Sequence, residues 1–290
     1  MFDLRYHVAS LAAVFLALII GILVGVGIAD RGLVDKARRS LLEQRVASLQ
    51  ARLNQATQRS AISKREQAAA QSYITDTYPV LAKNRLKGHR VAVVWVGGVD
   101  GALSSAIDQV MHDSSGVQIR ERELKVPVDD KQLDKKLAAQ PADKQYLGRT
   151  KLQDLGNALG AELITGGDTP LWDTLSDSLV DHQVGSGKQP VDGVIVARPG
   201  PPQRDGTSRF LFGFYQGLNS GGVPAVGIEA SNQDSSAVPI FKSAGLSSVD
   251  DVDTPAGRLA LVLLLAGSPG GQYGFKRTAG DGVLPSFARG

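Results

Sequence analysis

The sequence predicts an α/β protein in which an N-terminal transmembrane helix and a coiled-coil-like stalk precede a Rossmann-like domain with a mostly parallel sheet. Three observations predict this arrangement. A long uncharged segment opens the chain, a charged segment with helical periodicity follows it, and short apolar runs then alternate with amphipathic stretches. Strands that alternate with helices indicate βαβ units. We expect an anchor at residues 1–30, a stalk at 31–78, an α/β domain at 79–267 and a flexible tail at 268–290.

The anchor is predicted from residues 8–29, which are 22 positions without a charged side chain. At about 1.5 Å rise per residue, this run spans a hydrocarbon core of about 30 Å. A cleavable signal peptide is the alternative, but its apolar region would be shorter and a cleavage site would follow promptly. The segment after residue 29 is charged and helix-forming, so we expect an uncleaved anchor.

Small residues recur at every fourth position of the anchor, at Ala13, Ala17, Gly21, Gly25 and Ala29. Such a face lets two helix backbones approach closely, and Gly21 and Gly25 form a GxxxG pair. Ala17, Gly21 and Gly25 are therefore candidate oligomerisation residues. The alternative is that the stripe reflects the abundance of glycine and alanine in this chain.

The stalk carries apolar residues at the alternating spacing of a coiled-coil seam, namely Leu42, Val46, Leu49 and Leu53. The pattern weakens after about two heptads. A parallel dimer that uses these residues is one interpretation, and a single solvated helix is the other. Pro79 is expected to end the helix, because proline lacks a backbone donor and disfavours helical geometry in the preceding residue.

The remaining elements follow from local patterns. Apolar or alternating runs predict strands at 91–96, 117–120, 194–197 and 225–228, with a further short strand at 162–165. Amphipathic patterns predict helices at 102–111, 130–139, 150–160 and 208–218. Two more helices are expected to begin with a threonine N-cap and a proline at the first position, at Thr169 and Thr254. The last of these is too short to span a bilayer, so we expect it to be buried against the sheet.

Two glycine-rich turns, at 97–101 and 166–168, lie where α/β folds bind phosphate. Neither has the spacing of a dinucleotide-binding or P-loop motif, and Asp100 would repel an anion. We interpret both as tight turns. Asp250, Asp251 and Asp253 precede the last helix, where its dipole stabilises acidic residues, and their spacing is not that of an EF-hand loop.

Composition limits the chemistry that the chain can perform. No cysteine is present among the 290 residues, which excludes disulfides, thiolate metal sites and a cysteine nucleophile. The net charge is +3 with both signs interspersed, which argues against nucleic-acid binding. Among histidines and methionines only Met111 and His112 are adjacent, so they are the candidate metal ligands. No motif of an enzyme is present, and we expect neither a catalytic site nor a bound cofactor.

Both ends of the chain carry distinctive strings, at residues 1–7 and 247–258. With the anchor and stalk, they resemble the actinobacterial copper transport outer-membrane protein family, MctB-like, over most of the chain. The resemblance implies an envelope protein associated with copper efflux or tolerance. Bound copper is suggested by this family association alone. It also implies the alternative of a coiled-coil scaffold or regulator of envelope assembly or of a cell-wall hydrolase, without direct copper chemistry.

The expected partners are the membrane, further copies of the chain bound through anchor and stalk, and an envelope protein. The resemblance implies an extracytoplasmic globular domain. The charge distribution predicts the opposite, because Arg31, Lys36, Arg38, Arg39 and Arg45 follow the anchor and only Arg5 precedes it. The few short strands also do not match an outer-membrane barrel.

Overall fold

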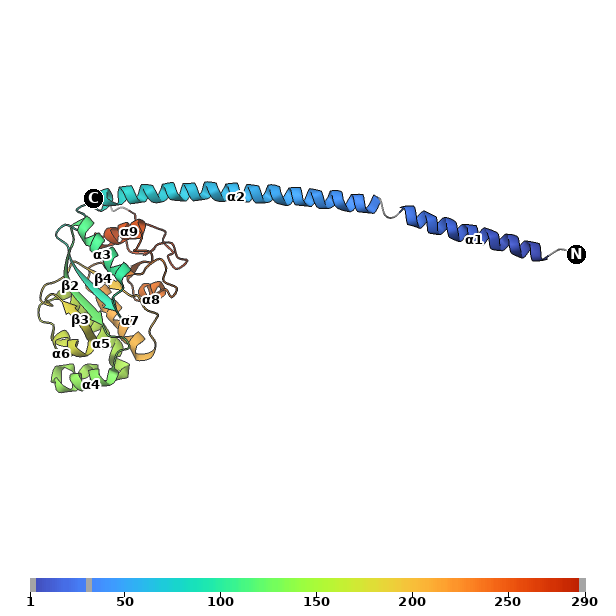
Figure 1. Ribbon diagram of the computed structural model, residues 1–290. Helices are drawn as coiled ribbons and strands as arrows, with labels where there is room; N and C mark the ends of the chain where they lie inside the picture. The colour runs from blue at the N-terminus through green and yellow to red at the C-terminus, as the bar shows by residue number, and fades with distance from the viewer. Residues whose placement is uncertain (1–3, 30–32, 287–290) are drawn as a thin grey trace. The chain divides into compact units, whose positions relative to one another are not determined.

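The computed structural model describes residues 4–29 and 33–286. The chain forms two compact units that divide between Ala70 and Gln71. The first, the helical unit, contains α1 (Leu4–Ala29) and most of α2 (Leu33–Ala82). The second, the α/β unit, contains the last turns of α2 and all later elements (Figure 1).

Helix α1 confirms the predicted N-terminal apolar helix. Its segment Tyr6–Gly27 is 22 residues long, apolar enough to cross a membrane, and buries none of its side chains within the protein. A helix that is apolar on every side is stable where its surroundings are also apolar. The segment is therefore a candidate membrane span.

Helix α2 corrects the prediction for Pro79, because this proline lies inside the helix, which continues to Ala82. Tyr78 and Ala82, on either side of it, are 2% and 0% exposed and belong to the core of the α/β unit. Most helical stability in proteins comes from tertiary packing. That packing holds the last turn in helical form although the Pro79 nitrogen has no hydrogen to donate.

The α/β unit is built on a sheet that has seven strands within the described residues, in the order β3-β2-β1-β4-β5-β6-β7. Every neighbouring pair is parallel except β2 and β3, so the predicted mostly parallel sheet is confirmed. The strands are β1 (Arg90–Val96), β2 (Val117–Leu124), β3 (Val180–Val184), β4 (Gly193–Ala197), β5 (Ala225–Ile228), β6 (Ser247–Val249) and β7 (Gln272–Tyr273).

Helices cover both faces of this sheet (Figure 1). One face carries the end of α2 with α3 (Gly101–Ser114) and α9 (Pro255–Leu265). The other carries α4 (Asp130–Ala139), α5 (Leu152–Thr165), α6 (Pro170–Leu179), α7 (Asp205–Ser220) and α8 (Val238–Ser243), and short 3-10 helices at Pro141–Tyr146 and Arg149–Lys151 lie between α4 and α5. Because side chains alternate along a strand, Val93 joins one core and Val94 the other. This explains why β1 and β4 read as continuous apolar runs.

Helices α5 and α7 pack backbone to backbone through glycines. A Cβ atom built on Gly156 would lie 2.1 Å from the carbonyl oxygen of Phe210, and one built on Gly213 would lie 2.0 Å from that of Gln153. The predicted strand at 162–165 is wrong, because α5 continues to Thr165. Its packing on α7 and the burial of Leu163 on the helix's inner face outweigh the apolar local pattern.

The sequence patterns do not predict β3, β6, β7 or α8. Strand β7 lies in the segment from residue 268 that is predicted to be loose, and that prediction is wrong for Gln272 and Tyr273, which are buried. The carbonyl of Gly271 accepts a hydrogen bond from Ser248 of β6, and Tyr273 accepts one from Asp250. These bonds and the burial of two side chains fix this part of the tail on the sheet.

Candidate functional site

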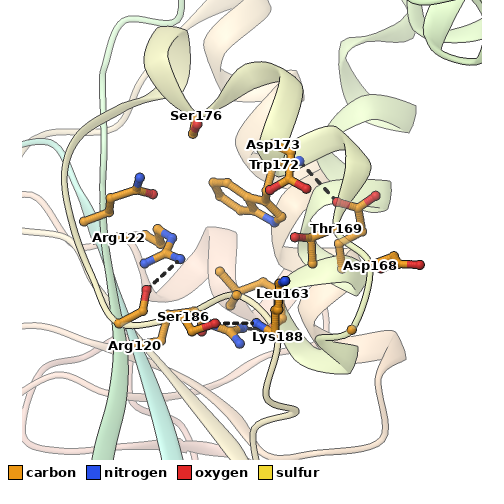
Figure 2. A pocket seen from close by; sticks show the side chains of 15 residues that line it. Arg120, Arg122, Leu163, Asp168, Thr169, Trp172, Asp173, Ser176, Ser186 and Lys188 are labelled. Carbon is orange, nitrogen blue, oxygen red and sulfur yellow. Dashed lines mark hydrogen bonds between the residues drawn. The ribbon is translucent and has the colours of Figure 1, made fainter.

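A pocket with a volume of about 430 Å³ lies beside β2 and β3. It is built by β2, the C-terminal end of α5, α6 and the loop that follows β3. Figure 2 shows Trp172, Asp173 and Ser176 of α6 in the upper half of the view, with Arg120, Ser186 and Lys188 below and Arg122 at the left.

The floor of the pocket is made by two buried arginines, Arg120 and Arg122, which are 2% and 7% exposed. They are two positions apart on β2 and therefore point to the same side of the sheet. Arg120 donates from Nε to the carbonyl of Ser186 at 3.0 Å and from Nη2 to that of Gln189 at 2.5 Å, and its Nη1 donates to Leu163. The guanidinium thereby fastens the loop after β3 to the end of α5.

Arg122 makes a second set of bonds, to its own strand, to the end of β3 and to the start of the loop that follows β3. Its Nη1 donates to the carbonyls of Glu121 at 2.7 Å and Val184 at 2.9 Å, and its Nη2 donates to Gly185 at 3.4 Å. Within the part of the chain that the structure describes, neither arginine has a carboxylate at salt-bridge distance. Burial, together with the charge of Arg122, lowers the pKa of Arg120 to about 10, and burial lowers the pKa of Arg122. Both guanidinium groups are charged at neutral pH.

The opposite wall is held by Glu162 of α5. Its carboxylate accepts hydrogen bonds from the backbone N–H groups of Leu171 at 3.3 Å and Trp172 at 3.2 Å, which lie at the start of α6. Burial raises the pKa of this carboxyl group. The indole Nε1 of Trp172 donates to the carbonyl of Leu159 at 2.9 Å, which fixes the ring in the wall.

This arrangement corrects one detail of the sequence analysis. Thr169 occupies the N-cap position of α6 as predicted, but in the described structure its side chain makes no capping bond. Glu162, from the preceding helix, takes that role instead. Thr254 does cap α9, because its Oγ1 accepts from the backbone N–H of Gly257 at 3.0 Å.

The aspartates before α9 do not cap that helix but hold neighbouring chain segments. Asp250 is fully buried and accepts from the backbone N–H groups of Phe275 at 3.0 Å and Lys276 at 3.4 Å. Asp251 is 1% exposed and accepts from the hydroxyl of Thr254 at 3.1 Å. Asp253 accepts from the backbone N–H of Ser231 at 2.6 Å. Burial raises the pKa of Asp250 and raises the pKa of Asp251 to about 6.

The first glycine-rich turn, at 97–101, has the role that the sequence predicts. The carboxylate of Asp100 accepts from the backbone N–H groups of Ala102 and Leu103, both at 2.9 Å, and so caps α3. Gly97 has a φ angle of +87°, which glycine adopts readily. The first turn is therefore a capped strand-to-helix connection.

The structure does not bring the candidate metal ligands together. Met111 is 7% exposed and lies on the buried side of α3, in the apolar core. The side chain of His112 is 89% exposed, and its Nδ1 lies 3.1 Å from Oδ1 of Asp113. Among residues 4–29 and 33–286, no group of three or more histidine, aspartate and glutamate side chains is arranged to hold a metal ion.

The candidate oligomerisation residues form exposed apolar surface on the helical unit. Ala17, Gly21 and Gly25 are exposed on α1, and no atom lies within 4 Å of a Cβ built on either glycine. The seam residues of α2 are each more than half exposed: Leu42 59%, Val46 53%, Leu49 62% and Leu53 66%.

Comparison with known proteins places the chain in a family. A family model described as copper transport outer membrane protein, MctB, matches residues 1–284. A search of curated proteins gives no match. The match covers the N-terminal apolar helix and the whole mostly parallel sheet, so it extends over both units. The family description associates the chain with copper transport, and the candidate membrane helix agrees with an association with a membrane. The chain therefore belongs to the MctB family of copper transport outer membrane proteins.

Proposed function

We propose that the protein serves the copper efflux or tolerance of its family as a membrane-tethered envelope scaffold. It self-associates through a coiled-coil stalk and does not coordinate copper itself. The observation that carries this proposal is the exposed apolar seam of α2, formed by Leu42, Val46, Leu49 and Leu53. Family membership and the candidate membrane span support the envelope location.

The seam favours a parallel pair of helices. Its members are spaced by four, three and four residues, so they form one stripe on a helix whose other positions are mainly polar or charged. A second helix that covers the stripe removes apolar surface from water at each layer. The small-residue face of α1 points to the same kind of association within the membrane.

The scarcity of metal-ligating side chains argues against a copper centre in this chain. Copper(I) prefers thiolate and thioether ligands, and the sequence has no cysteine and only two methionines. Met111 is buried among apolar side chains, and His112 points away from it into solvent. We infer that copper is handled by a partner protein that this scaffold holds in place.

Cysteine cross-linking in membranes tests the stalk directly, because the natural chain has no cysteine to interfere. In a parallel, in-register dimer, residue 49 of one copy faces residue 49 of the other. Leu49→Cys should form a disulfide-linked dimer under mild oxidation. Ala51→Cys, on the opposite side of the helix, is the matched control and should stay monomeric. Equal cross-linking of the two variants, or none in either, contradicts the coiled-coil stalk.

Two further measurements test whether the chain binds copper directly and on which side of the membrane the α/β unit lies. Copper titration of the full chain in detergent should show no stoichiometric binding with a Kd of about 1 μM or tighter. Such binding would overturn the proposal of an indirect role. Protease treatment of spheroplasts should cleave the α/β unit, because we propose that it is extracytoplasmic. Protection would instead agree with the five positive charges that follow the anchor in the sequence, at Arg31, Lys36, Arg38, Arg39 and Arg45.

A further inference from the structure

We propose that the pocket of Figure 2 binds a small oxyanion, a molecule with one carboxylate or phosphoryl head group, on the guanidinium of Arg122. The buried charge of Arg120 lies on the same floor and adds to the attraction. All residues that line the pocket belong to the α/β unit, so binding there requires neither the stalk nor copper.

Arg120 and Arg122 have no countercharge among the described residues. Both arginines are more than nine-tenths buried, yet their described partners are backbone carbonyls. A buried charge is normally paired, because removal from water is otherwise costly. Burial lowers the pKa of Arg120 and of Arg122, because the charged guanidinium groups have lost water without gaining a countercharge. An oxyanion in the pocket would supply the negative countercharge that these two arginines lack among the described residues.

One edge of the Arg122 guanidinium is available to a ligand. The hydrogens of Nη1 are engaged by the carbonyls of Glu121 and Val184. Nη2 has only the long 3.4 Å contact to Gly185, and Nε donates to no acceptor within the described residues. The Nε–Nη2 edge can hold two oxygens of a carboxylate or phosphate side by side, the strongest arrangement for an arginine.

The acidic residues of the pocket limit which anion fits. Glu162 is engaged with the N–H groups at the start of α6. Asp168 and Asp173 are exposed on the rim, where solvent and salt screen them. They would repel a polyanion but tolerate a single head group. The pocket has a volume of about 430 Å³ and is lined on one side by the Trp172 ring, which leaves space for a small organic group attached to that head group.

Trp172 provides a local reporter. The chain has two tryptophans, and Trp95 lies in the other core, where its Nε1 donates to Glu121. The full chain in detergent is labelled with 5-fluorotryptophan, and the two ¹⁹F resonances are assigned with Trp95→Phe. Inorganic phosphate, acetate and the neutral molecule glycerol are titrated separately at constant ionic strength.

We expect the Trp172 resonance to shift and saturate with phosphate or acetate, with a Kd of about 1 mM or tighter, while glycerol has no effect. Saturation with phosphate alone identifies a phosphoryl ligand, and saturation with acetate alone identifies a carboxylate. No saturable shift with either anion overturns the proposal.

Variants separate binding in the pocket from a general charge effect. Arg122→Gln should weaken binding at least about tenfold, because a charge-assisted bond pair is lost. Arg149→Gln is the control, since this arginine pairs with Asp130 on the surface and its side chain is 72% exposed. Ser176→Leu fills the pocket and leaves both floor arginines in place, so it should abolish binding even if Arg122→Gln fails to fold. Unchanged affinity in Ser176→Leu contradicts the site.

Discussion

The ammonium group of Lys276 lies 3.3 Å from the carboxylate of Glu229, whose side chain is completely buried at the end of β5. Lys276 also donates to the carbonyls of Ala230 at 2.8 Å and Gln233 at 3.1 Å. The carboxylate accepts from the backbone N–H of Ala237 and from the hydroxyl of Ser236 at 3.3 Å. One buried ion pair thus joins the segment after β7 to the connection between β5 and α8.

Lys276→Met should lower the free energy of unfolding of the α/β unit by about 3 kcal/mol, because it leaves the Glu229 charge buried without its partner. Urea unfolding followed by tryptophan fluorescence measures this, since both tryptophans lie in the α/β unit. Lys151→Met is the matched control. Its pair with Asp154 is exposed to solvent and is expected to contribute little to stability. Equal losses in the two variants would show that the buried pair is not special.

Gly213→Ala should destabilise the α/β unit by about 1–3 kcal/mol, because the new methyl group would meet the carbonyl oxygen of Gln153 at 2.0 Å. The helices α5 and α7 would have to separate. Gly98→Ala is the control, since no atom lies within 4 Å of a Cβ at that position. The same urea titration compares them. A Gly213→Ala variant as stable as Gly98→Ala would contradict the close backbone packing.

The stability of the α/β unit should fall as pH rises from about 4 to about 6, because of Asp251. Its pKa is about 6 in the folded protein, where it is buried, against about 3.9 in an unfolded chain. Between these values the folded state holds a proton that the unfolded state has lost. Deprotonation within the fold then removes about 3 kcal/mol across the window.

Asp251→Asn should flatten this pH dependence, although Asp250, whose pKa burial also raises, retains part of it. Unfolding free energies of wild type and variant are compared between pH 4 and pH 7. Parallel curves would mean that Asp251 titrates alike in the folded and unfolded states.

Thr254→Ala should cost about 1 kcal/mol of stability, because the backbone N–H of Gly257 at the start of α9 loses its acceptor. Thr254→Ser retains the hydroxyl and should retain most of that stability. Thermal unfolding of the two variants, side by side with wild type, tests the cap. A Thr254→Ser variant as unstable as Thr254→Ala would assign the loss to the missing methyl group.

Sequence patterns predict the elements whose signals are local. The apolar run of α1, the buried strand β1 and the Thr254–Pro255 start of α9 each depend on neighbouring residues only. Pro79 and the segment 162–165 show where this fails. In both, packing between elements far apart in sequence decides the conformation, so the helix continues against its local preference. The short strands β6 and β7 are stabilised by pairing rather than by composition.

The sequence patterns do not predict the pocket, for the same reason. Arg120 and Arg122 alternate with glutamates along β2, which is typical of a solvated strand face. Only the fold shows that the loop after β3 and the end of α5 cover the arginines. Only Arg120 lies within the strand predicted at 117–120, because the observed β2 extends to Leu124 and so includes Arg122. Arginines that alternate along and just beyond a predicted strand, followed later by a glycine-rich loop, are a sequence signal for this site.

The two edge strands of the sheet have a consequence for the self-association on a membrane that we propose. Tethered copies meet at high effective concentration, and an open strand edge would then invite sheet-to-sheet fusion. Here one border is β7, which has two residues, and the other is the short β3, which carries exposed Asp181. Short and charged borders offer little template for another strand. The α/β units can therefore be crowded together and still remain separate folded bodies.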